Sequence, residues 1–326
     1  MTSSSGGFVG ATDLARDPRN ANLYGVSGNY LYRLEPTDRD DDDDDNDGYN
    51  QPIGTLIHNR DLVAVTVDPD GDVFVLTEDG ELKMLDASEN KLLFVAGTLT
   101  GNNYADGVGA AAGLGTAGRL VSPSAGVVYM ADQGASSFRR ITFNKQAAGG
   151  PVGTVKTLAG FPAGTAGNRA GCRDGRGALA RFDAPGGLAR ATDGSFYISE
   201  PNSFAIRKVV VDTAADVGVV STIAGNNQAY ADGVGSAAEF NTLGRNLAID
   251  GDNLLYVADT GPFPYNAPKA IRRIDPATRQ VTTVSGGPGS NAVMTPKIVL
   301  VEQSGDLLVT ESPTVVKRLR LVGSPP

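Results

Sequence analysis

Three segments of the chain repeat one pattern, reading Tyr104-Ala-Asp-Gly-Val-Gly-Ala-Ala-Ala-Gly-Leu114, Cys172-Arg-Asp-Gly-Arg-Gly-Ala-Leu-Ala-Arg-Phe182 and Tyr230-Ala-Asp-Gly-Val-Gly-Ser-Ala-Ala-Glu-Phe240. An apolar run ending in Ala-Gly precedes each copy, and two short runs of alternating apolar residues around a glycine-containing turn follow it. Alternation with a period of two predicts strands, and the turn between them predicts a hairpin. A unit of short strands that recurs in this way is typical of a propeller or another repeat array.

The hairpin unit can be traced six times along the chain. A third strand follows each copy, and the six third strands begin at Leu31, Leu82, Phe138, Ile206, Ile271 and Val316. With the Ala-Gly segment as a fourth strand, the pattern predicts an all-β, six-bladed β-propeller of four-stranded antiparallel blades. We expect a single domain over residues 1–326, with an acidic insertion at about residues 37–52. We also expect residues 7–9 to complete the last blade, because that would remove the open edge between first and last units.

The recurring motifs Asp-Gly-x-Gly, Leu-Tyr-Val-Ala-Asp and Ile-Arg-Arg-Ile-Asp, clearest between residues 220 and 275, resemble the NHL-repeat family of propellers. The resemblance extends over nearly the whole chain and implies a propeller fold. It implies no particular function, because propellers host many unrelated activities.

Composition agrees with this fold and limits the function. The chain has 42 glycines and no tryptophan, which suits many tight turns and excludes the WD40 signature. The net charge of −9 is local, since residues 38–47 hold eight aspartates and one arginine. The remainder is nearly neutral, so a nucleic-acid partner is not expected. No apolar stretch reaches membrane-spanning length. We therefore expect a soluble protein, extracellular if the chain is a processed product or an excerpt.

The acidic insertion has two interpretations. Asp43, Asp45 and Asp47 alternate ahead of Gly48, as in the first half of a calcium loop. The twelfth position is Gly54 instead of a bidentate glutamate. The segment is therefore either a weak Ca²⁺ site or a solvated, self-repelling acidic loop.

Basic residues recur on the third strands and define a candidate partner surface. An annulus of Arg140, Arg207, Arg272 and Arg318 at one mouth of the channel could hold a phosphate, a carboxylate or an acidic peptide. Alternatively, the basic residues pair with acidic residues that recur just upstream, at Glu78, Asp132, Glu200, Asp259 and Glu311. Two further candidate contact residues, Phe263 and Tyr265, lie in a proline-rich loop, where insertions into a repeat often mark the binding side.

The glycines of the Asp-Gly-x-Gly copies have a structural interpretation. None continues into a phosphate-binding signature, so we expect the glycines to supply positive φ, and the apolar residue that ends each motif to enter the core.

The side-chain inventory argues against most catalytic chemistries. His58 is the single histidine, Cys172 is the single cysteine, and neither belongs to a nucleophile motif. A Ca²⁺- or Mg²⁺-dependent, lactonase-like hydrolase remains possible, with ligands at the channel mouth drawn from Asp132, Glu200, Asp259, Glu311 and Asn202. The sequence favours a non-catalytic protein-interaction or structural scaffold module, as a subunit of a homo- or hetero-assembly or an extracellular recognition domain. The metal-dependent hydrolase is the alternative.

Overall fold

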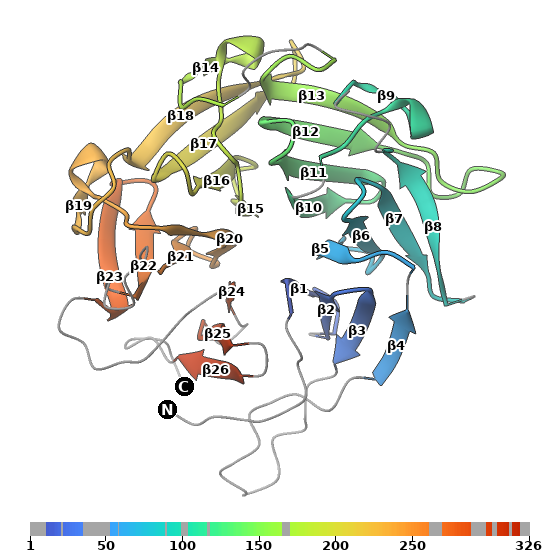
Figure 1. Ribbon diagram of the computed structural model, residues 1–326, viewed down its shortest axis with the longest axis horizontal. Helices are drawn as coiled ribbons and strands as arrows, with labels where there is room; N and C mark the ends of the chain where they lie inside the picture. The colour runs from blue at the N-terminus through green and yellow to red at the C-terminus, as the bar shows by residue number, and fades with distance from the viewer. Residues whose placement is uncertain are drawn as a thin grey trace, which may run out of the picture.

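The computed structural model describes residues 11–20, 22–34, 53–57, 59–88, 90–98, 104–115, 118–164, 170–260, 269–287, 298–301, 305–312 and 315–319. These residues form antiparallel sheets arranged in a ring, and the strands nearest its centre are β1, β5, β10, β15, β20 and β24 (Figure 1). The predicted all-β propeller is confirmed. No helix of the described residues is long and apolar enough to cross a membrane.

The sheets follow one another in chain order. Sheet 1 contains β1 (Asp13–Arg16), β2 (Leu23–Ser27), β3 (Tyr30–Leu34) and β4 (Ile53–Ile57). Sheet 2 contains β5 (Leu62–Val67), β6 (Val73–Thr77), β7 (Leu82–Asp86) and β8 (Lys91–Ala96). Sheet 3 contains β10 (Gly118–Ser124), β11 (Val127–Asp132), β12 (Ser137–Thr142) and β13 (Thr154–Gly160), with β9 (Gly107–Val108) added at its outer edge.

Sheets 4 and 5 repeat the arrangement of sheet 3. Sheet 4 contains β15 (Leu188–Arg190), β16 (Phe196–Glu200), β17 (Ala205–Asp212), β18 (Val217–Gly225) and the edge strand β14 (Gly175–Arg176). Sheet 5 contains β20 (Leu243–Ile249), β21 (Leu255–Asp259), β22 (Ala270–Asp275), β23 (Gln280–Gly286) and the edge strand β19 (Gly233–Val234). Sheet 6 contains β24 (Ile298–Val301), β25 (Leu307–Ser312) and β26 (Val315–Leu319).

The prediction of six four-stranded blades is wrong in detail. Five sheets carry four or five strands, whereas sheet 6 has three among the described residues. The fifth strand of sheets 3, 4 and 5 comes from the Asp-Gly-x-Gly segment, which was not among the four strands expected for each unit. Residues 7–9, expected to complete the last blade, lie outside the described residues.

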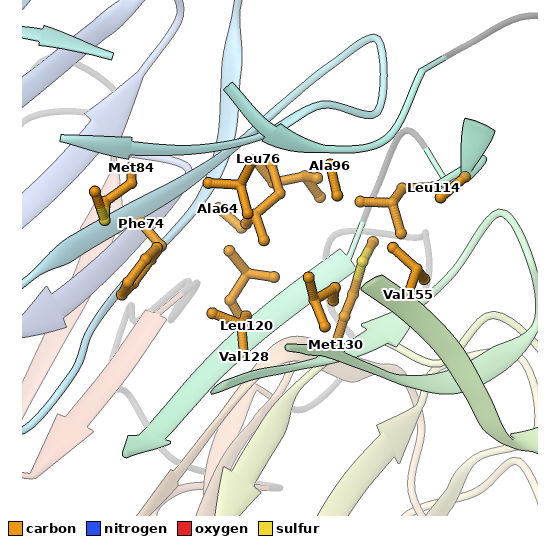
Figure 2. Packing of buried hydrophobic residues seen from close by; sticks show 14 residues of the cluster. Ala64, Phe74, Leu76, Met84, Ala96, Leu114, Leu120, Val128, Met130 and Val155 are labelled. Atoms are coloured by element: carbon orange, nitrogen blue, oxygen red, sulfur yellow. The ribbon is translucent and has the colours of Figure 1, made fainter. Parts of the chain in front are cut away.

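The hydrophobic core is divided among the interfaces between neighbouring sheets. Six clusters of buried residues are present, one at each interface around the ring. The cluster between sheets 2 and 3 includes Phe74, Leu76, Leu120 and Met130 (Figure 2). Because inner strands are covered on both faces, β6, β16 and β21 are buried at every residue. This explains their near-continuous apolar sequences.

The Asp-Gly-x-Gly segments behave as the sequence predicts. Each leads into a short 3-10 turn: η1 (Gly109–Ala111), η2 (Gly177–Leu179) and η3 (Gly235–Ala237). The first glycine of each turn has φ of +56°, +53° and +60°, respectively, a region that favours glycine. The apolar residues that end the motif are buried in the interface clusters, namely Leu114, Phe182 and Phe240.

Candidate functional site

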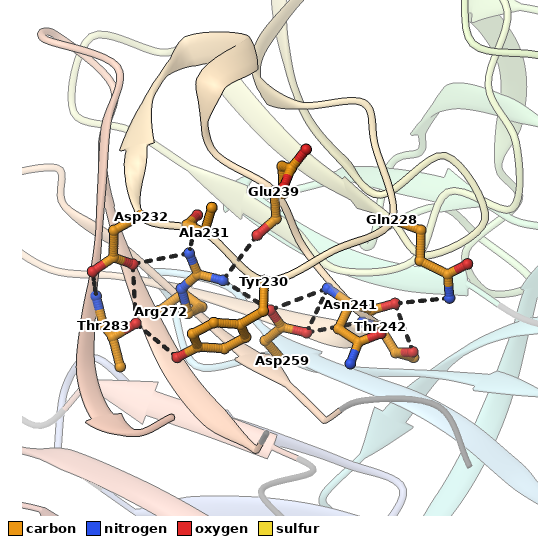
Figure 3. A network of polar contacts seen from close by, with 10 residues as sticks. All are labelled: Gln228, Tyr230, Ala231, Asp232, Glu239, Asn241, Thr242, Asp259, Arg272 and Thr283. Carbon is orange, nitrogen blue, oxygen red and sulfur yellow. Dashed lines mark hydrogen bonds and ion pairs between the residues drawn. The ribbon is translucent and has the colours of Figure 1, made fainter. Parts of the chain in front are cut away.

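A buried arginine holds together the polar interior of sheet 5. Arg272 on β22 donates through Nη1 to Asp259 Oδ2 at 2.9 Å, and through Nη2 to Asp232 Oδ1 at 2.9 Å (Figure 3). The same guanidinium also donates to the backbone carbonyls of Glu239 and Ala231. Its side chain is 0 % exposed. Arg272 therefore joins β21, β22 and the connection that enters sheet 5.

Asp232, the aspartate of the repeated motif, also accepts hydrogen bonds from the outer strand β23. The pairing of β22 with β23 shifts register between Ile271 and Arg272. Beyond that irregularity, the backbone N–H and the hydroxyl of Thr283 both donate to the Asp232 carboxylate, at 2.9 and 3.0 Å. The Asp232 carboxylate thus accepts the Thr283 N–H close to the register shift between β22 and β23.

Sheets 3 and 4 contain the same network. Three carboxylate–arginine–carboxylate sets result, comprising Asp106–Arg139–Asp132, Asp174–Arg207–Glu200 and Asp232–Arg272–Asp259. The threonines that correspond to Thr283 are Thr157 and Thr222, and each donates through its N–H and its hydroxyl. The predicted pairing of upstream acidic residues with strand arginines is present in these three sheets.

Burial sets the electrostatics of these networks. It raises the pKa of the Glu200 carboxyl to about 7 against the opposing charge of Arg207, and it also raises the pKa of Asp259. Removing one member of a buried pair leaves the other charge uncompensated, which costs about 3–5 kcal/mol. The networks therefore act as internal clamps that resist rearrangement of each sheet.

The arginines expected to contact a partner do not share one surface. The side chains of Arg207 and Arg272 are 0 % exposed, and such buried guanidinium groups are poorly placed to contact a partner molecule. Arg140 is 24 % exposed and binds Asp216 of sheet 4 at 2.6 Å. Its neighbour Arg139, rather than Arg140, is the counterpart of Arg207 and Arg272, an alignment that strand alternation alone could have given. The side chain of Arg318 lies outside the described residues.

Several other predicted positions also lie outside the described residues. They are Asp43, Asp45 and Asp47 of the acidic insertion and the loop residues Phe263 and Tyr265. Their proposed roles stay predictions. The single histidine, His58, also lies outside the described residues.

An arginine also links the innermost strands at the centre of the ring. Arg119 on β10 donates to the carbonyls of Thr12 and Val63 at 2.8 and 3.1 Å. Its Nε lies 3.4 Å from Asp13 Oδ1 on β1. Burial raises the pKa of Asp13, and Arg119 opposes that rise. A single side chain thus connects sheets 1, 2 and 3, and the sequence pattern had not identified it.

The carboxylates expected to bind a metal are engaged elsewhere. Asp132, Glu200 and Asp259 are fully buried and accept from arginines. Asn202 donates to Asp183 Oδ1 at 3.1 Å. The side chain of Glu311 lies outside the described residues. The geometry of the described members does not favour this predicted ligand set.

One other acidic cluster has donors for a cation. Asp68, Asp70 and Asp72 lie in the turn between β5 and β6, with ligand oxygens within 4.8 Å of one another. Asp68 Oδ1 accepts the N–H groups of Asp70 and Asp72, whereas buried Asp68 Oδ2 has no hydrogen-bond partner among the described residues. Lys145 Nζ lies 2.9 Å from Asp70 Oδ2 and 2.5 Å from Asp72 Oδ2. The lysine therefore already supplies the charge that a cation would bring.

A cavity of about 560 Å³ opens beside this turn. It is bounded by the β1–β2 turn of sheet 1, by the β5–β6 turn and the β7–β8 hairpin of sheet 2, and by Lys145 and Gln146 of sheet 3. A volume of this size lies within the range of small-molecule sites, roughly 300–1,000 Å³. This cavity is the candidate binding site of the chain.

Sheet 4 differs from sheet 5 at one exposed position. In sheet 5 the Tyr230 ring lies over the Arg272 guanidinium, 4.5 Å from ring centroid to Cζ. The counterpart in sheet 4 is the exposed, free Cys172, whose Sγ lies 3.4 Å from Arg207 Nη1. Although the residue as a whole is exposed, desolvation where the thiol lies against Arg207 raises its pKa, and the charge of Glu200 raises the pKa further. The thiolate form is thus disfavoured, which does not suit a nucleophile.

Comparisons with known proteins support the fold. No protein-family model matches the chain, and no curated protein matches it in sequence. A Bacteroides thetaiotaomicron protein of unknown function is similar in structure, with 15% identity, a TM-score of 0.61, and coverage of 95% of this chain and 69% of that one. A Xanthomonas campestris gluconolactonase has 12% identity, a TM-score of 0.58, and coverage of 97% and 87%. The calcium-binding protein regucalcin from Agrobacterium tumefaciens has 12% identity, a TM-score of 0.58, and coverage of 98% and 94%.

These similarities define the class of the chain as a β-propeller. At such low identity they show the fold alone, because one propeller fold carries many activities. The NHL-repeat resemblance is not confirmed by a family match.

Proposed function

We propose that this chain is a non-catalytic binding propeller, a rigid frame that presents a cavity and loop surfaces to a ligand or protein partner. The observation that carries the proposal is the repeated arginine–carboxylate network. Its arginines are 0 % exposed and bind the carboxylates Asp132, Glu200 and Asp259. Side chains used in this way stabilise the sheets, and a stable frame is what a binding module requires.

The arginine at the centre of the ring also supports a binding frame. Arg119 crosses from β10 to Asp13 and to the carbonyl of Thr12. Divalent cations such as Ca²⁺ and Mg²⁺ need carboxylate and carbonyl oxygens that are free to coordinate them. At this position the Arg119 guanidinium donates hydrogen bonds to the carbonyls of Thr12 and Val63 and forms an ion pair with the Asp13 carboxylate.

A metal-dependent hydrolase is the second candidate. The Asp68, Asp70 and Asp72 cluster favours it, because three carboxylates offer hard oxygen ligands. The structural neighbours include a gluconolactonase and a calcium-binding protein, which is consistent with the hydrolase, although their similarity extends to the fold alone. Against it, Lys145 competes for two of the three carboxylates.

Native mass spectrometry of the protein isolated from its source, with calcium and with chelator, tests the proposal. We expect a retained small ligand or a defined complex whose mass does not depend on chelator. Dissociation by chelator would assign binding to an acidic segment instead. A bare monomer in both conditions, together with metal-dependent turnover of a lactone, would replace the binding frame with the hydrolase.

A further inference from the structure

The cavity between sheets 1, 2 and 3 has a charge-balanced lining. It contains three cationic and three anionic side chains, namely Arg19, Arg33, Lys145, Asp17, Asp72 and Asp86. Arg19 Nη2 lies 2.9 Å from Asp17 Oδ2, and Lys145 Nζ lies 2.5 Å from Asp72 Oδ2. Because the formal charges of the lining sum to zero, and four of the six are paired with one another, the site offers no net attraction to an anion or to a cation.

The ion pairs still present hydrogen-bonding groups to the cavity. Arg19 is 50 % exposed, and Lys145 and Asp72 are 27 % and 32 % exposed. The exposed amides of Asn20 and Gln146 add donors and acceptors, and Asn20 Oδ1 also accepts the backbone N–H of Asn22 in its own turn. A hydroxyl group both donates and accepts, so a ligand rich in hydroxyls can satisfy a mixed lining of this kind.

One part of the wall is apolar. The Tyr24 ring, Met84 and Leu93 line the cavity and are buried or partly buried. Ligand sites usually combine such apolar surface with a few polar groups that fix orientation. A sugar ring has this combination, since its hydroxyls project from a framework of C–H groups.

We propose that this cavity binds an uncharged, polyhydroxylated small molecule of the saccharide class. This inference rests on the proposed binding function and specifies its ligand. The paired charges orient the hydroxyl groups, while the apolar wall covers the carbon framework.

Saturation-transfer NMR with the full chain tests this assignment. The probes are glucose, maltose and myo-inositol, with gluconate as an anionic analogue and glucosamine as a cationic one. We expect the neutral probes to bind in preference to both charged analogues. Asn20→Ala and Gln146→Ala should each weaken binding about 3- to 10-fold, as expected for loss of a hydrogen bond. Gln228→Ala is the matched control, because this exposed amide lies in the connection between β18 and β19 and is not part of the cavity lining.

A variant that removes one charge from the lining tests whether the probes bind in this cavity. Lys145→Met leaves the Asp72 carboxylate without its lysine and should shift the preference toward glucosamine. Tighter binding of gluconate or glucosamine than of glucose by the unaltered protein overturns the assignment. So does a failure of every probe to bind at millimolar concentration, or binding that the two cavity variants leave unchanged. A defined protein complex in the native spectra, without probe binding, would leave the binding frame standing and reject only the saccharide class.

Discussion

Arg207 Nη1 lies 2.8 Å from Glu200 Oε2, and both side chains are 0 % exposed. The same relationship joins Arg139 to Asp132 and Arg272 to Asp259. Three copies of one buried ion pair in successive sheets indicate a repeated structural element. For a single catalytic centre, the sheets would instead contribute different side chains.

Replacing one member of this pair should destabilise the fold strongly. We expect Arg207→Met to lower the free energy of unfolding by about 3–5 kcal/mol, because Glu200 would be left buried and uncompensated. Adding Glu200→Leu should recover much of that loss. Urea unfolding of both single variants and the double variant measures the coupling. Arg140→Met is the control, since the partly exposed pair with Asp216 should contribute about 0–1 kcal/mol. Equal effects at Arg207 and Arg140 would refute the clamp.

The raised pKa of the Glu200 carboxyl should make the protein less stable as the pH rises. Burial raises the pKa of its carboxyl in the folded state from 4.5 to about 7. Its contribution is therefore fully present below pH 4.5 and is lost as the pH rises to about 7. Free energies of unfolding measured across this window should fall less steeply in Glu200→Gln than in the unaltered protein. Parallel slopes would show that the carboxyl is not perturbed.

The lowered pKa of the Asp216 carboxyl should make the protein less stable as the pH falls. Hydrogen bonds from Arg140 and Lys156 lower the pKa of this carboxyl from 3.8 to about 2. Its contribution is present above pH 3.8 and is lost as the pH falls toward 2. The effect should be small, because the side chain is 34 % exposed. Asp216→Asn should flatten the acid limb of the unfolding profile, and a profile that keeps its full acid dependence would contradict this reasoning.

The secondary structure and its repetition could be predicted from the sequence. Period-two alternation and the recurring Asp-Gly-x-Gly segment indicated a propeller, and the burial of Leu114, Phe182 and Phe240 followed from the pattern. Pairing of upstream acids with strand arginines was also expected as one of two alternatives.

The candidate site could not be predicted in the same way. Its parts come from different sheets: Arg19 from sheet 1, Asp72 from sheet 2 and Lys145 from sheet 3. No spacing in the sequence relates these residues, since only the packing of three successive sheets brings them together. Arg119 was missed for the same reason, because its partners lie on β1 and β5, and long-range contacts leave no local periodicity.

Lys145 should weaken calcium binding at the turn that holds Asp68, Asp70 and Asp72. Its ammonium group lies against Asp70 and Asp72, so Lys145→Met should raise the calcium affinity of this turn. Calorimetry of the variant should show binding heat that Asp68→Asn then abolishes. The acidic insertion provides an independent comparison, through Asn substitutions at Asp43, Asp45 and Asp47. Calcium affinity that does not change in Lys145→Met would show that the lysine does not occupy a cation position.

The most direct test of the binding frame is a hydrolysis assay. Purified protein is incubated with a panel of sugar lactones and Ca²⁺, Mg²⁺ or Zn²⁺, with and without EDTA, and the released acid is measured. We expect a rate equal to that of buffer in every condition, because Arg139, Arg207 and Arg272 hold the carboxylates that a channel-mouth metal would need. A rate above buffer that EDTA removes, and that Glu200→Gln abolishes without unfolding the chain, would contradict it.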